Sequence, residues 1–196
     1  MNSKILFNSP DFENPIPELE QYCTPPDIAF EIIKKVNSAG NLSGKIADLG
    51  CGTGRLTIAA AILGANVTGF EIDENAIKIA KDYSKRNNLK VNWINEPIEG
   101  IEDKFDTVIM NPPFGSQRPG ADKIFLEKAM NIATDIWTIH LSETRKFIEK
   151  LVEKNNCEII ELYEFDYPLK NTMPFHSKDT KVENAILYHI ASLPKQ

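Results

Sequence analysis

The chain has 196 residues, of which 42% are hydrophobic and 26% are charged, and its formal net charge is -6 at pH 7. This length suits one domain with a full core, and the composition excludes a disordered, fibrous or collagen-like protein. The acidic balance also excludes nucleic-acid binding through overall charge, so such binding would need a local basic patch or a partner.

The cysteine content and the hydropathy indicate an intracellular setting. Cys23, Cys51 and Cys157 are odd in number and lack metal-type spacing, which favours reduced thiols and predicts no metal site. No apolar run reaches the ~18 residues needed to span a membrane, and the N-terminus lacks the layout of a secretory signal. We therefore expect a cytoplasmic protein without a membrane partner.

The first 20 residues are polar and marked by prolines, which predicts a loosely attached N-terminal arm, followed by a single domain over residues 21–196. The helix start that follows is predicted at residues 24–27. Thr24 would be its N-cap, Pro25 its first residue, and Asp27 the second member of a capping box.

From residue 45 onward, predicted strands and helices alternate. Such alternation indicates an α/β fold with a mainly parallel sheet and helices on both faces. No helical pattern separates the last two strands, so we expect an antiparallel pair at one edge. The strands are predicted at 46–49, 67–72, 91–94, 105–110, 136–140, 158–165 and 182–190, and the helices at 56–63, 75–86, 123–133 and 143–153.

A glycine-rich loop follows the first strand, with the sequence Asp48-Leu-Gly50-Cys-Gly52-Thr-Gly54. Ligands bind at the carboxyl ends of such strands, and closely spaced glycines let the backbone approach them. A dinucleotide loop has the spacing Gly-x-Gly-x-x-Gly, which this loop lacks. Asp48 would repel a phosphate and attract an ammonium group, directly or through water. The loop therefore predicts S-adenosylmethionine, and not NAD, beside Asp48, Gly50 and Gly52.

Two acidic residues follow the second strand. An acidic side chain at this strand end can accept both hydroxyl groups of a ribose. Asp73 directly precedes a predicted helix, a position that suits an N-cap. We assign Glu71 to the ribose and Asp73 to capping.

The third strand ends in Asn95-Glu96-Pro97-Ile98, where the adenine of the cofactor should lie. Pro97 has no backbone donor, so a backbone hydrogen bond to the ring must come from Ile98. Asn95 or Glu96 is placed to reach the amino group of the ring.

The fourth strand ends in Asn111-Pro112-Pro113-Phe114. The prolines stiffen this loop and remove two donors, which leaves the Asn111 side-chain oxygen and the Pro112 carbonyl as acceptors. Two acceptors would hold both protons of an exocyclic amine and aim its lone pair at a sulfonium methyl. Phe114 can stack on a flipped base. The loop predicts methyl transfer to an amine with these four residues as the catalytic group, and Asn111 is expected to contact the cofactor as well.

These motifs resemble class I methyltransferases that modify amino nitrogens. Together with the segments at residues 20–24, 105–115, 121–129 and 175–178, they resemble more closely the small ribosomal-RNA adenine N6-methyltransferases called methyltransferase-like protein five. The likeness runs over nearly the whole chain from about residue 18. It implies a Rossmann-like, mostly parallel seven-stranded sheet with an antiparallel last strand.

The resemblance also carries site residues and partners. It implies that Gln21 and Thr24 close over the cofactor near Gly50, Thr53 and Arg55, and that ribosomal RNA is the substrate. The family is further similar to enzymes that pair with a small zinc-binding activator, which covers a sheet edge.

A basic loop supplies the expected RNA contact. His176 and Lys178 lie with Lys170 and Lys181, and we expect them to contact RNA phosphates with strong salt dependence. Arg118 and Lys123, just past the tetrapeptide, could act in the same way.

Other interpretations stay open. The tetrapeptide by itself also fits DNA adenine or protein glutamine methylation, and a non-catalytic cofactor-binding scaffold is a third reading. His140, Trp93 and Trp137 occur in strand patterns, and we interpret them as structural residues.

Overall fold

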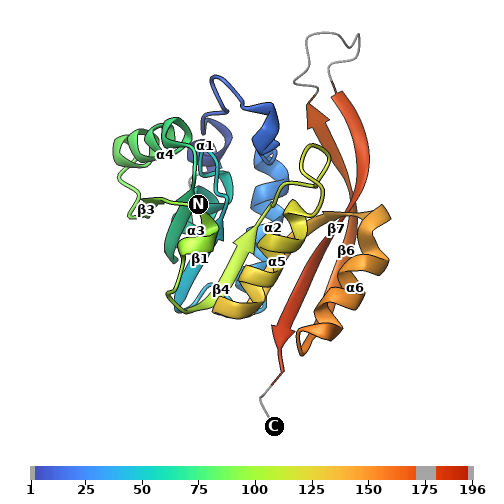
Figure 1. Cartoon of the computed structure of the whole chain (residues 1–196). Helices are drawn as coiled ribbons and strands as arrows, with labels where there is room; N and C mark the ends of the chain where they lie inside the picture. The colour runs from blue at the N-terminus through green and yellow to red at the C-terminus, as the bar shows by residue number, and fades with distance from the viewer. Residues whose placement is uncertain (1–2, 171–179, 194–196) are drawn as a thin grey trace.

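A seven-stranded sheet runs through the molecule (Figure 1), and the computed structural model describes residues 3–170 and 180–193. The strands are β1 (Lys45–Leu49), β2 (Asn66–Glu71), β3 (Asn92–Asn95), β4 (Phe105–Met110), β5 (Ala133–Leu141), β6 (Cys157–Lys170) and β7 (Thr180–Ser192). Their order is β3-β2-β1-β4-β5-β7-β6. The pairings from β3 to β5 are parallel, and β7 is antiparallel to both β5 and β6. The predicted fold class is confirmed.

The strand order reverses between β1 and β4. The chain moves outward from β1 to β2 and β3, then returns to place β4 on the other side of β1. In open sheets of this kind a crevice forms at the carboxyl ends of the strands at the reversal. The glycine-rich loop after β1 and the tetrapeptide after β4 therefore lie on either side of one crevice.

Helices cover both faces of the sheet (Figure 1). One face carries α1 (Ser3–Phe7), α2 (Pro26–Ser38), α3 (Arg55–Ile62) and α4 (Glu74–Arg86), and the other carries α5 (Ala121–Ile132) and α6 (Arg145–Lys154). Short 3-10 turns lie at Pro17–Leu19, Ile98–Gly100 and Ser142–Thr144.

The central strands are buried on both faces, as their continuous apolar sequences predict. In β1 every residue after Lys45 is buried, and in β4 the residues Val108, Ile109 and Met110 are at most 1% exposed. Each fully buried aliphatic side chain stabilises the fold by about 1.5–3 kcal/mol. The sheet thus forms a rigid floor for the loops at its carboxyl edge.

The last strands are longer than their sequence patterns predict. β5 begins at Ala133, because the chain passes directly from α5 into an extended residue with φ -134° and ψ 159°. β6 and β7 pair from Cys157 with Ser192 to Lys170 with Thr180. This ladder extends beyond the apolar stretches, because the antiparallel hydrogen bonds do not require buried side chains.

Thr24 does not cap α2, so the predicted capping box is wrong. The helix begins at Pro26 with Pro25 at the N-cap position, and no side-chain cap is made. The Thr24 hydroxyl instead accepts a hydrogen bond from the Asn111 amide at 3.1 Å. The Thr24 hydroxyl, which the local sequence pattern assigns to the helix cap, is therefore used in a tertiary hydrogen bond with Asn111.

The N-terminal arm is packed against the domain, so the expectation of loose attachment is wrong. Leu6 is 1% exposed within the core, and the Tyr83 hydroxyl donates to the Ile5 carbonyl at 2.6 Å. The Arg55 guanidinium donates to the carbonyls of Ser9 and Pro10 at 3.3 Å. The short helix α1 and a buried cation hold the arm, neither of which the proline spacing reveals.

Candidate active site

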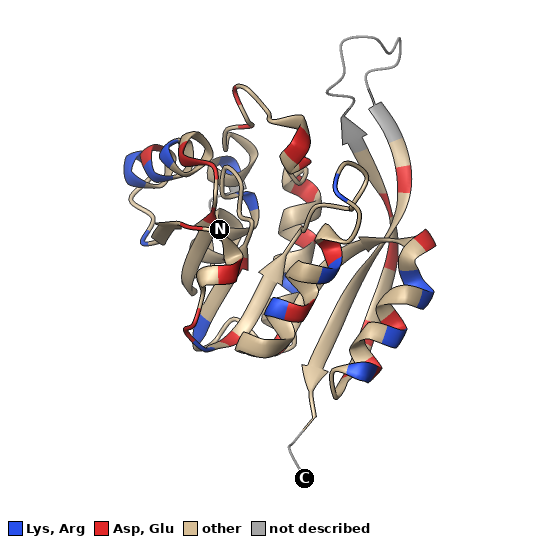
Figure 2. Ribbon diagram, in the orientation of Figure 1, with Lys and Arg blue, Asp and Glu red and all other residues tan. Residues whose placement is uncertain are grey.

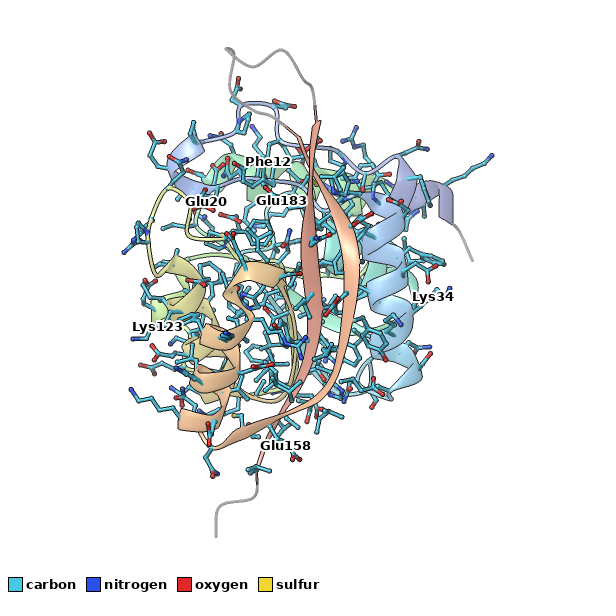
Figure 3. All side chains as sticks on the ribbon, turned by 90° about the vertical axis from the view of Figure 1, so that its right-hand side faces the viewer. Phe12, Glu20, Lys34, Lys123, Glu158 and Glu183 are labelled. Carbon is cyan, nitrogen blue, oxygen red and sulfur yellow. The ribbon has the colours of Figure 1, made fainter. Side chains whose placement is uncertain are left out.

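A cavity lies where the carboxyl ends of β1, β2, β3 and β4 meet the N-terminal arm. Figure 3 shows Phe12 and Glu20 of the arm at the same end of the molecule, with Glu158 at the opposite end. All eleven residues predicted to bind the cofactor line this one cavity. They are Gln21, Thr24, Asp48, Gly50, Gly52, Thr53, Arg55, Glu71, Glu96, Ile98 and Asn111.

Two glycines show most clearly why the loop after β1 needs bare backbone. Gly52 and Gly54 have φ values of 54° and 89°, a left-handed conformation that costs other residues about 1–2 kcal/mol. A Cβ at Gly52 would lie 2.6 Å from the Phe12 ring, and one at Gly54 would lie 2.3 Å from the Trp93 ring. The Phe12 ring of the arm and the Trp93 ring of the core therefore pack directly on glycine backbone, where a side chain would not fit.

Asp48 lies beneath this loop and is 1% exposed. Its Oδ2 atom accepts hydrogen bonds from the Thr57 amide at 3.0 Å and the Thr57 hydroxyl at 2.6 Å. Burial raises the pKa of Asp48 to about 7, opposed by the Thr57 hydrogen bonds and reinforced by the charge of Glu71. A cation bound over the loop would favour the carboxylate form.

Glu71 joins the ends of β1 and β2. Its two carboxylate oxygens accept from the amides of Gly52 at 2.8 Å and Asp73 at 2.9 Å. Burial raises the pKa of Glu71, while these backbone hydrogen bonds act in the opposite direction. The carboxylate is fixed at the cavity wall, where its ribose contact stays a prediction.

Asp73 caps α4, as predicted, by accepting from the Asn75 amide at 2.9 Å. Its second oxygen accepts from the Gln21 side chain at 2.8 Å. Gln21 also accepts from the Ile16 amide at 2.7 Å, so this side chain fastens the arm to the domain. The arm thereby forms one wall of the cavity.

Thr53 and Arg55 point to the arm. The Thr53 hydroxyl donates to the Pro10 carbonyl at 2.8 Å, the same carbonyl that Arg55 contacts. Both residues also line the cavity, so they connect the position of the arm to the shape of the pocket.

The three residues of the predicted adenine corner, Glu96, Pro97 and Ile98, all line the cavity. The Asn95 amide donates instead to the carbonyls of Glu71 and Ile72 at 2.9 and 3.0 Å. Of the two side chains considered for the amino group, Glu96 therefore faces the cavity and Asn95 braces β2.

Asn111 stands at the end of β4 with its amide group fixed on one side. Its Nδ2 atom donates to the Tyr167 hydroxyl at 2.9 Å and to the Thr24 hydroxyl at 3.1 Å. Its Oδ1 atom is buried and has no hydrogen-bond partner among the residues that the structure describes. Leaving such an acceptor unpaired costs about 1–3 kcal/mol, which a substrate donor can recover.

The other three residues of the tetrapeptide either form part of the cavity wall or pack behind it. Pro113 lines the cavity and Pro112 is buried beside it. Phe114 is half-buried and packs edge-to-face on Tyr167, with ring centroids 6.0 Å apart. Tyr167 itself is fully buried in β6, beyond the apolar run that predicted this strand, and no local motif marks it as a site residue.

Glu20 is a second site residue that lies outside the predicted set. It has a left-handed backbone with φ 49°, and its Oε1 atom accepts from the Gln117 amide at 2.7 Å. Its Oε2 atom is buried without a partner in the described part of the chain. Glu20 therefore joins the arm to the loop that follows the tetrapeptide.

The charge of the cavity suits a cation. Its lining holds six carboxylate residues, Glu18, Glu20, Asp48, Glu71, Glu96 and Glu99, against the two cations Arg55 and Arg118. Figure 2 shows many of the Lys and Arg residues instead along α4 and α6. S-adenosylmethionine carries a sulfonium and an ammonium group, and the acidic lining and the bare loop backbone fit it.

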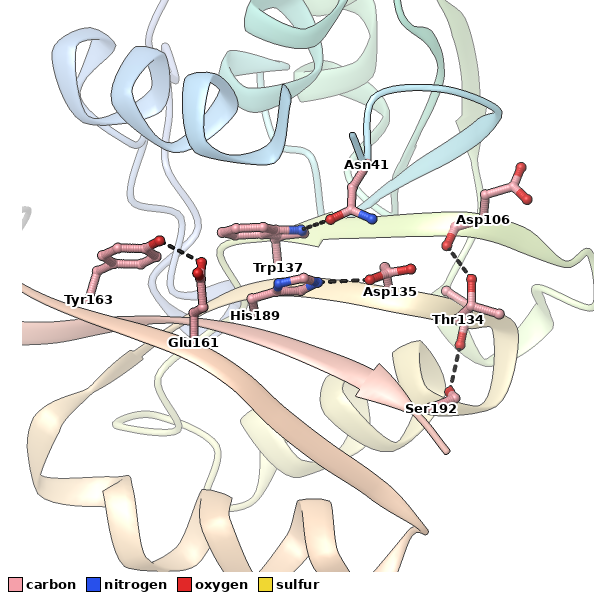
Figure 4. Close-up of polar contacts among 10 residues, drawn as sticks. Asn41, Asp106, Thr134, Asp135, Trp137, Glu161, Tyr163, His189 and Ser192 are labelled. Carbon is pink, nitrogen blue, oxygen red and sulfur yellow. Dashed lines mark hydrogen bonds and ion pairs between the residues drawn. The ribbon is translucent and has the colours of Figure 1, made fainter. Parts of the chain in front are cut away.

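Residues interpreted as structural lie away from the cavity. Trp93 and Trp137 are buried, and His140 is 1% exposed with Nε2 2.9 Å from the Thr138 hydroxyl. Burial lowers the pKa of His140 to about 3, so the ring is neutral. In Figure 4, Trp137 stacks on His189 with centroids 4.3 Å apart, and His189 contacts Asp135 at 2.7 Å.

The predicted RNA contacts at His176 and Lys178 lie outside the described residues. Arg118 is exposed at the cavity mouth, and Lys123 is exposed on α5 at 3.8 Å from Glu127.

Residues 3–170 and 180–193 contain no group of three His, Cys, Asp or Glu residues that is placed to hold a metal ion. No helix in this part of the chain combines the length and apolarity needed to cross a membrane.

The fold has close counterparts among solved structures. A Pyrococcus horikoshii protein described as a candidate RNA methyltransferase matches with a TM-score of 0.91 and 32% identity, covering 98% of this chain and 96% of that one. Magnesium protoporphyrin IX methyltransferase from Synechocystis, solved with bound SAM, shares the fold with a TM-score of 0.68 and 19% identity, covering 85% of this chain and 79% of that one. The profile of the "Methyltransferase small domain" family matches residues 27–136. Fold and site thus define an S-adenosylmethionine-dependent methyltransferase.

Sequence relatives narrow this class. The rRNA N(6)-adenosine-methyltransferase METTL5 of Danio rerio is 37% identical over 177 residues, covering 85% of this chain and 86% of that protein. A Methanocaldococcus jannaschii protein is 36% identical over 194 residues, covering 92% and 88%. The chain belongs to the METTL5 family of methyltransferases, and S-adenosylmethionine is its methyl donor.

Proposed function

We propose that this protein methylates the exocyclic N6 amine of an adenine in ribosomal RNA. The buried Oδ1 atom of Asn111 carries this proposal, because it is an acceptor without a donor among the described residues and Asn111 lines the cavity. An exocyclic amine has two protons to donate. The relatives named rRNA N(6)-adenosine-methyltransferases support adenine over other amines.

The residues of this chain orient the amine. S-adenosylmethionine supplies an electrophilic methyl group when bound, and Asp48, Glu71 and the glycine loop would hold it. Asn111 Oδ1 and the Pro112 carbonyl would each accept one amine proton, which turns the nitrogen lone pair toward the methyl group. The methylated, cationic amine then loses a proton readily, so no general base must act first.

A methyl-transfer assay tests the proposal. Labelled S-adenosylmethionine is supplied with ribosomal RNA, with double-stranded DNA, or with a protein extract. The RNA is then digested to nucleosides and analysed by mass spectrometry. We expect label in RNA and N6-methyladenosine as the product. Label only in DNA or protein, or another methylated nucleoside, would overturn the substrate assignment, and transfer to none of the substrates would favour a non-catalytic scaffold.

RNA binding is proposed to involve the basic loop at His176 and Lys178, with Arg118 at the cavity mouth as a further phosphate contact. Phosphate contacts weaken steeply with salt. Lys178→Glu should therefore reduce RNA affinity in a filter-binding titration at low salt. An unchanged affinity there would contradict the role of Lys178.

A small zinc-binding activator protein is proposed as a partner, on the family resemblance. Both β3 and β6 are edge strands, and exposed edges are often covered by a partner. Ile72, at the end of β2 next to β3, is 54% exposed. Sedimentation and methyl-transfer rates of the purified chain test this proposal. A monomer with full activity on RNA would overturn it.

A further inference from the structure

The Asn111 amide is held by residues from two distant parts of the chain. Asn111 follows β4, Thr24 lies just before α2, and Tyr167 lies in β6. The amide nitrogen has two protons, and each has a hydroxyl acceptor, at 2.9 Å on Tyr167 and 3.1 Å on Thr24. The amide therefore has no free proton left to point into the cavity.

This arrangement decides which end of the amide faces the substrate. With both protons held, the Oδ1 atom is left as the free group. A half-turn of the amide would exchange the two ends and present N–H donors to an amine that itself donates protons. Donor would then meet donor, and the amine would not be oriented. Either hydroxyl could in principle donate to the oxygen of a half-turned amide, but the Tyr167 and Thr24 hydroxyls also hydrogen-bond each other, which engages the proton of one of them. A half-turned amide would therefore keep only one of its two hydrogen bonds to this pair, and the hydroxyl pair thus favours the productive orientation of Asn111.

Tyr167 is built to be rigid. Its side chain is fully buried, its ring packs edge-to-face on Phe114 and Phe165, and its backbone pairs with Glu183 of β7. Burial raises the pKa of Tyr167 well above its usual value, against the effect of its contacts with Thr24 and Asn111. The hydroxyl therefore remains neutral at physiological pH.

We propose that Tyr167 is a positioning residue for methyl transfer, which together with Thr24 fixes the Asn111 amide so that Oδ1 receives the substrate amine. This inference rests on the proposed function. Tyr167 is not part of the cavity lining, so it acts through Asn111 and does not touch the substrate.

The first test is Tyr167→Phe, which removes the hydroxyl and keeps the ring that packs on Phe114. We expect kcat for RNA methylation to fall about 10- to 100-fold, the size of effect that misorientation of a reacting group produces. The KM for RNA and the affinity for S-adenosylmethionine should stay within about twofold, because no cavity contact is removed. Tyr163→Phe is the matched control, since the Tyr163 hydroxyl contacts Glu161 on the same strand, outside the cavity.

The second test places Tyr167→Phe in an Asn111→Ala background, with single-turnover rates measured at excess enzyme. If Tyr167 acts through Asn111, the second change should not lower the rate further. Thr24→Ser, which keeps a hydroxyl, should retain most of the activity, whereas Thr24→Val should lower kcat in the same way as Tyr167→Phe.

The outcomes separate this inference from the proposed function. A normal kcat in Tyr167→Phe, or an equal further loss in the Asn111→Ala background, would overturn the positioning role. If Asn111→Ala itself retained full activity, the proposed chemistry of the site would fail first.

Discussion

The two sides of the cavity are built in different ways. On the cofactor side, the carboxylates of Asp48, Glu71 and Asp73 each accept backbone amides, from residues between two and 19 positions away in sequence. On the substrate side, Asn111 and Glu20 contact residues 56 to 97 positions away, and each leaves one buried oxygen without a partner among the described residues.

This difference indicates that the two sides of the cavity have different tasks, binding the cofactor on one side and orienting the substrate amine on the other. The three carboxylates of the cofactor side have their partners and are expected to be preformed, whereas the Arg55 Nε atom on that side is buried without a partner among the described residues. The substrate side keeps acceptors unsatisfied, at about 1–3 kcal/mol each, so that an amine is the group that completes it. The predictions below test whether damage to each side has the effect that this division implies.

The largest effect is expected from Asn111→Ala. Loss of the unpartnered acceptor should lower kcat by about 10²–10³-fold, as removal of a single preorganised hydrogen-bonding group does in other enzymes. Cofactor affinity, measured by calorimetry, should fall by much less than kcat, because Asn111 is one of eleven predicted cofactor contacts. Asn92→Ala, on the exposed edge strand β3, is the control. Equal loss of cofactor binding and of kcat would contradict the division into two sides.

Gly54→Ala should affect the cofactor side by lowering the free energy of unfolding of the protein. The new Cβ would meet the Trp93 ring at 2.3 Å and requires a left-handed backbone, so we expect a loss of about 3 kcal/mol in the free energy of unfolding. Gly64 has a similar φ of 84° with nothing within 4 Å of its Cβ position, and Gly64→Ala should lose only about 1 kcal/mol. Urea unfolding measures both, and equal losses would exclude the clash as the cause.

Asp48 should make cofactor binding depend on pH. Its pKa of about 7 means that lowering the pH from 8 to 6 protonates the carboxylate that would attract the ammonium group. S-adenosylmethionine affinity should then fall about tenfold over this range, since one proton is bound. Asp48→Asn should abolish the pH dependence. An affinity that is constant with pH in the unmodified protein would remove the ammonium role of Asp48.

The folding free energy should respond to the same group with the opposite sign. The folded pKa of Asp48 is above its unfolded value, so the folded state binds the proton more tightly between about pH 4 and pH 7. This contribution to stability is present at low pH and is lost as the pH rises through 7. Glu71, whose pKa is also raised, acts in the same direction.

The smallest effect on catalysis is expected at His140, which belongs to neither side. His140→Asn should leave kcat within about twofold while lowering the free energy of unfolding by about 1–2 kcal/mol, because a buried hydrogen bond to Thr138 is lost. The lowered pKa of His140 also predicts that the unmodified protein loses stability as the pH falls below about 6.5, since the unfolded state binds the proton first. A large loss of kcat would give this histidine a role in the reaction.

The sequence by itself determined the order of strands and helices, the glycine loop and the acidic residues of the cofactor side. These features depend on neighbours a few positions apart, where hydrophobic periodicity, glycine conformation and capping act. The Asn-Pro-Pro-Phe loop was also visible, because prolines restrict their own backbone.

Only the tertiary structure decided what holds that loop. Thr24 does not cap the predicted helix and accepts a hydrogen bond from Asn111. Tyr167 lies beyond the predicted part of β6 and also accepts from Asn111, and Glu20 accepts from Gln117. The sequence also gives no sign that the arm docks on Arg55. A hydrogen bond between residues this far apart depends on how the sheet, the arm and the loops pack together, and no local pattern in the chain encodes that packing.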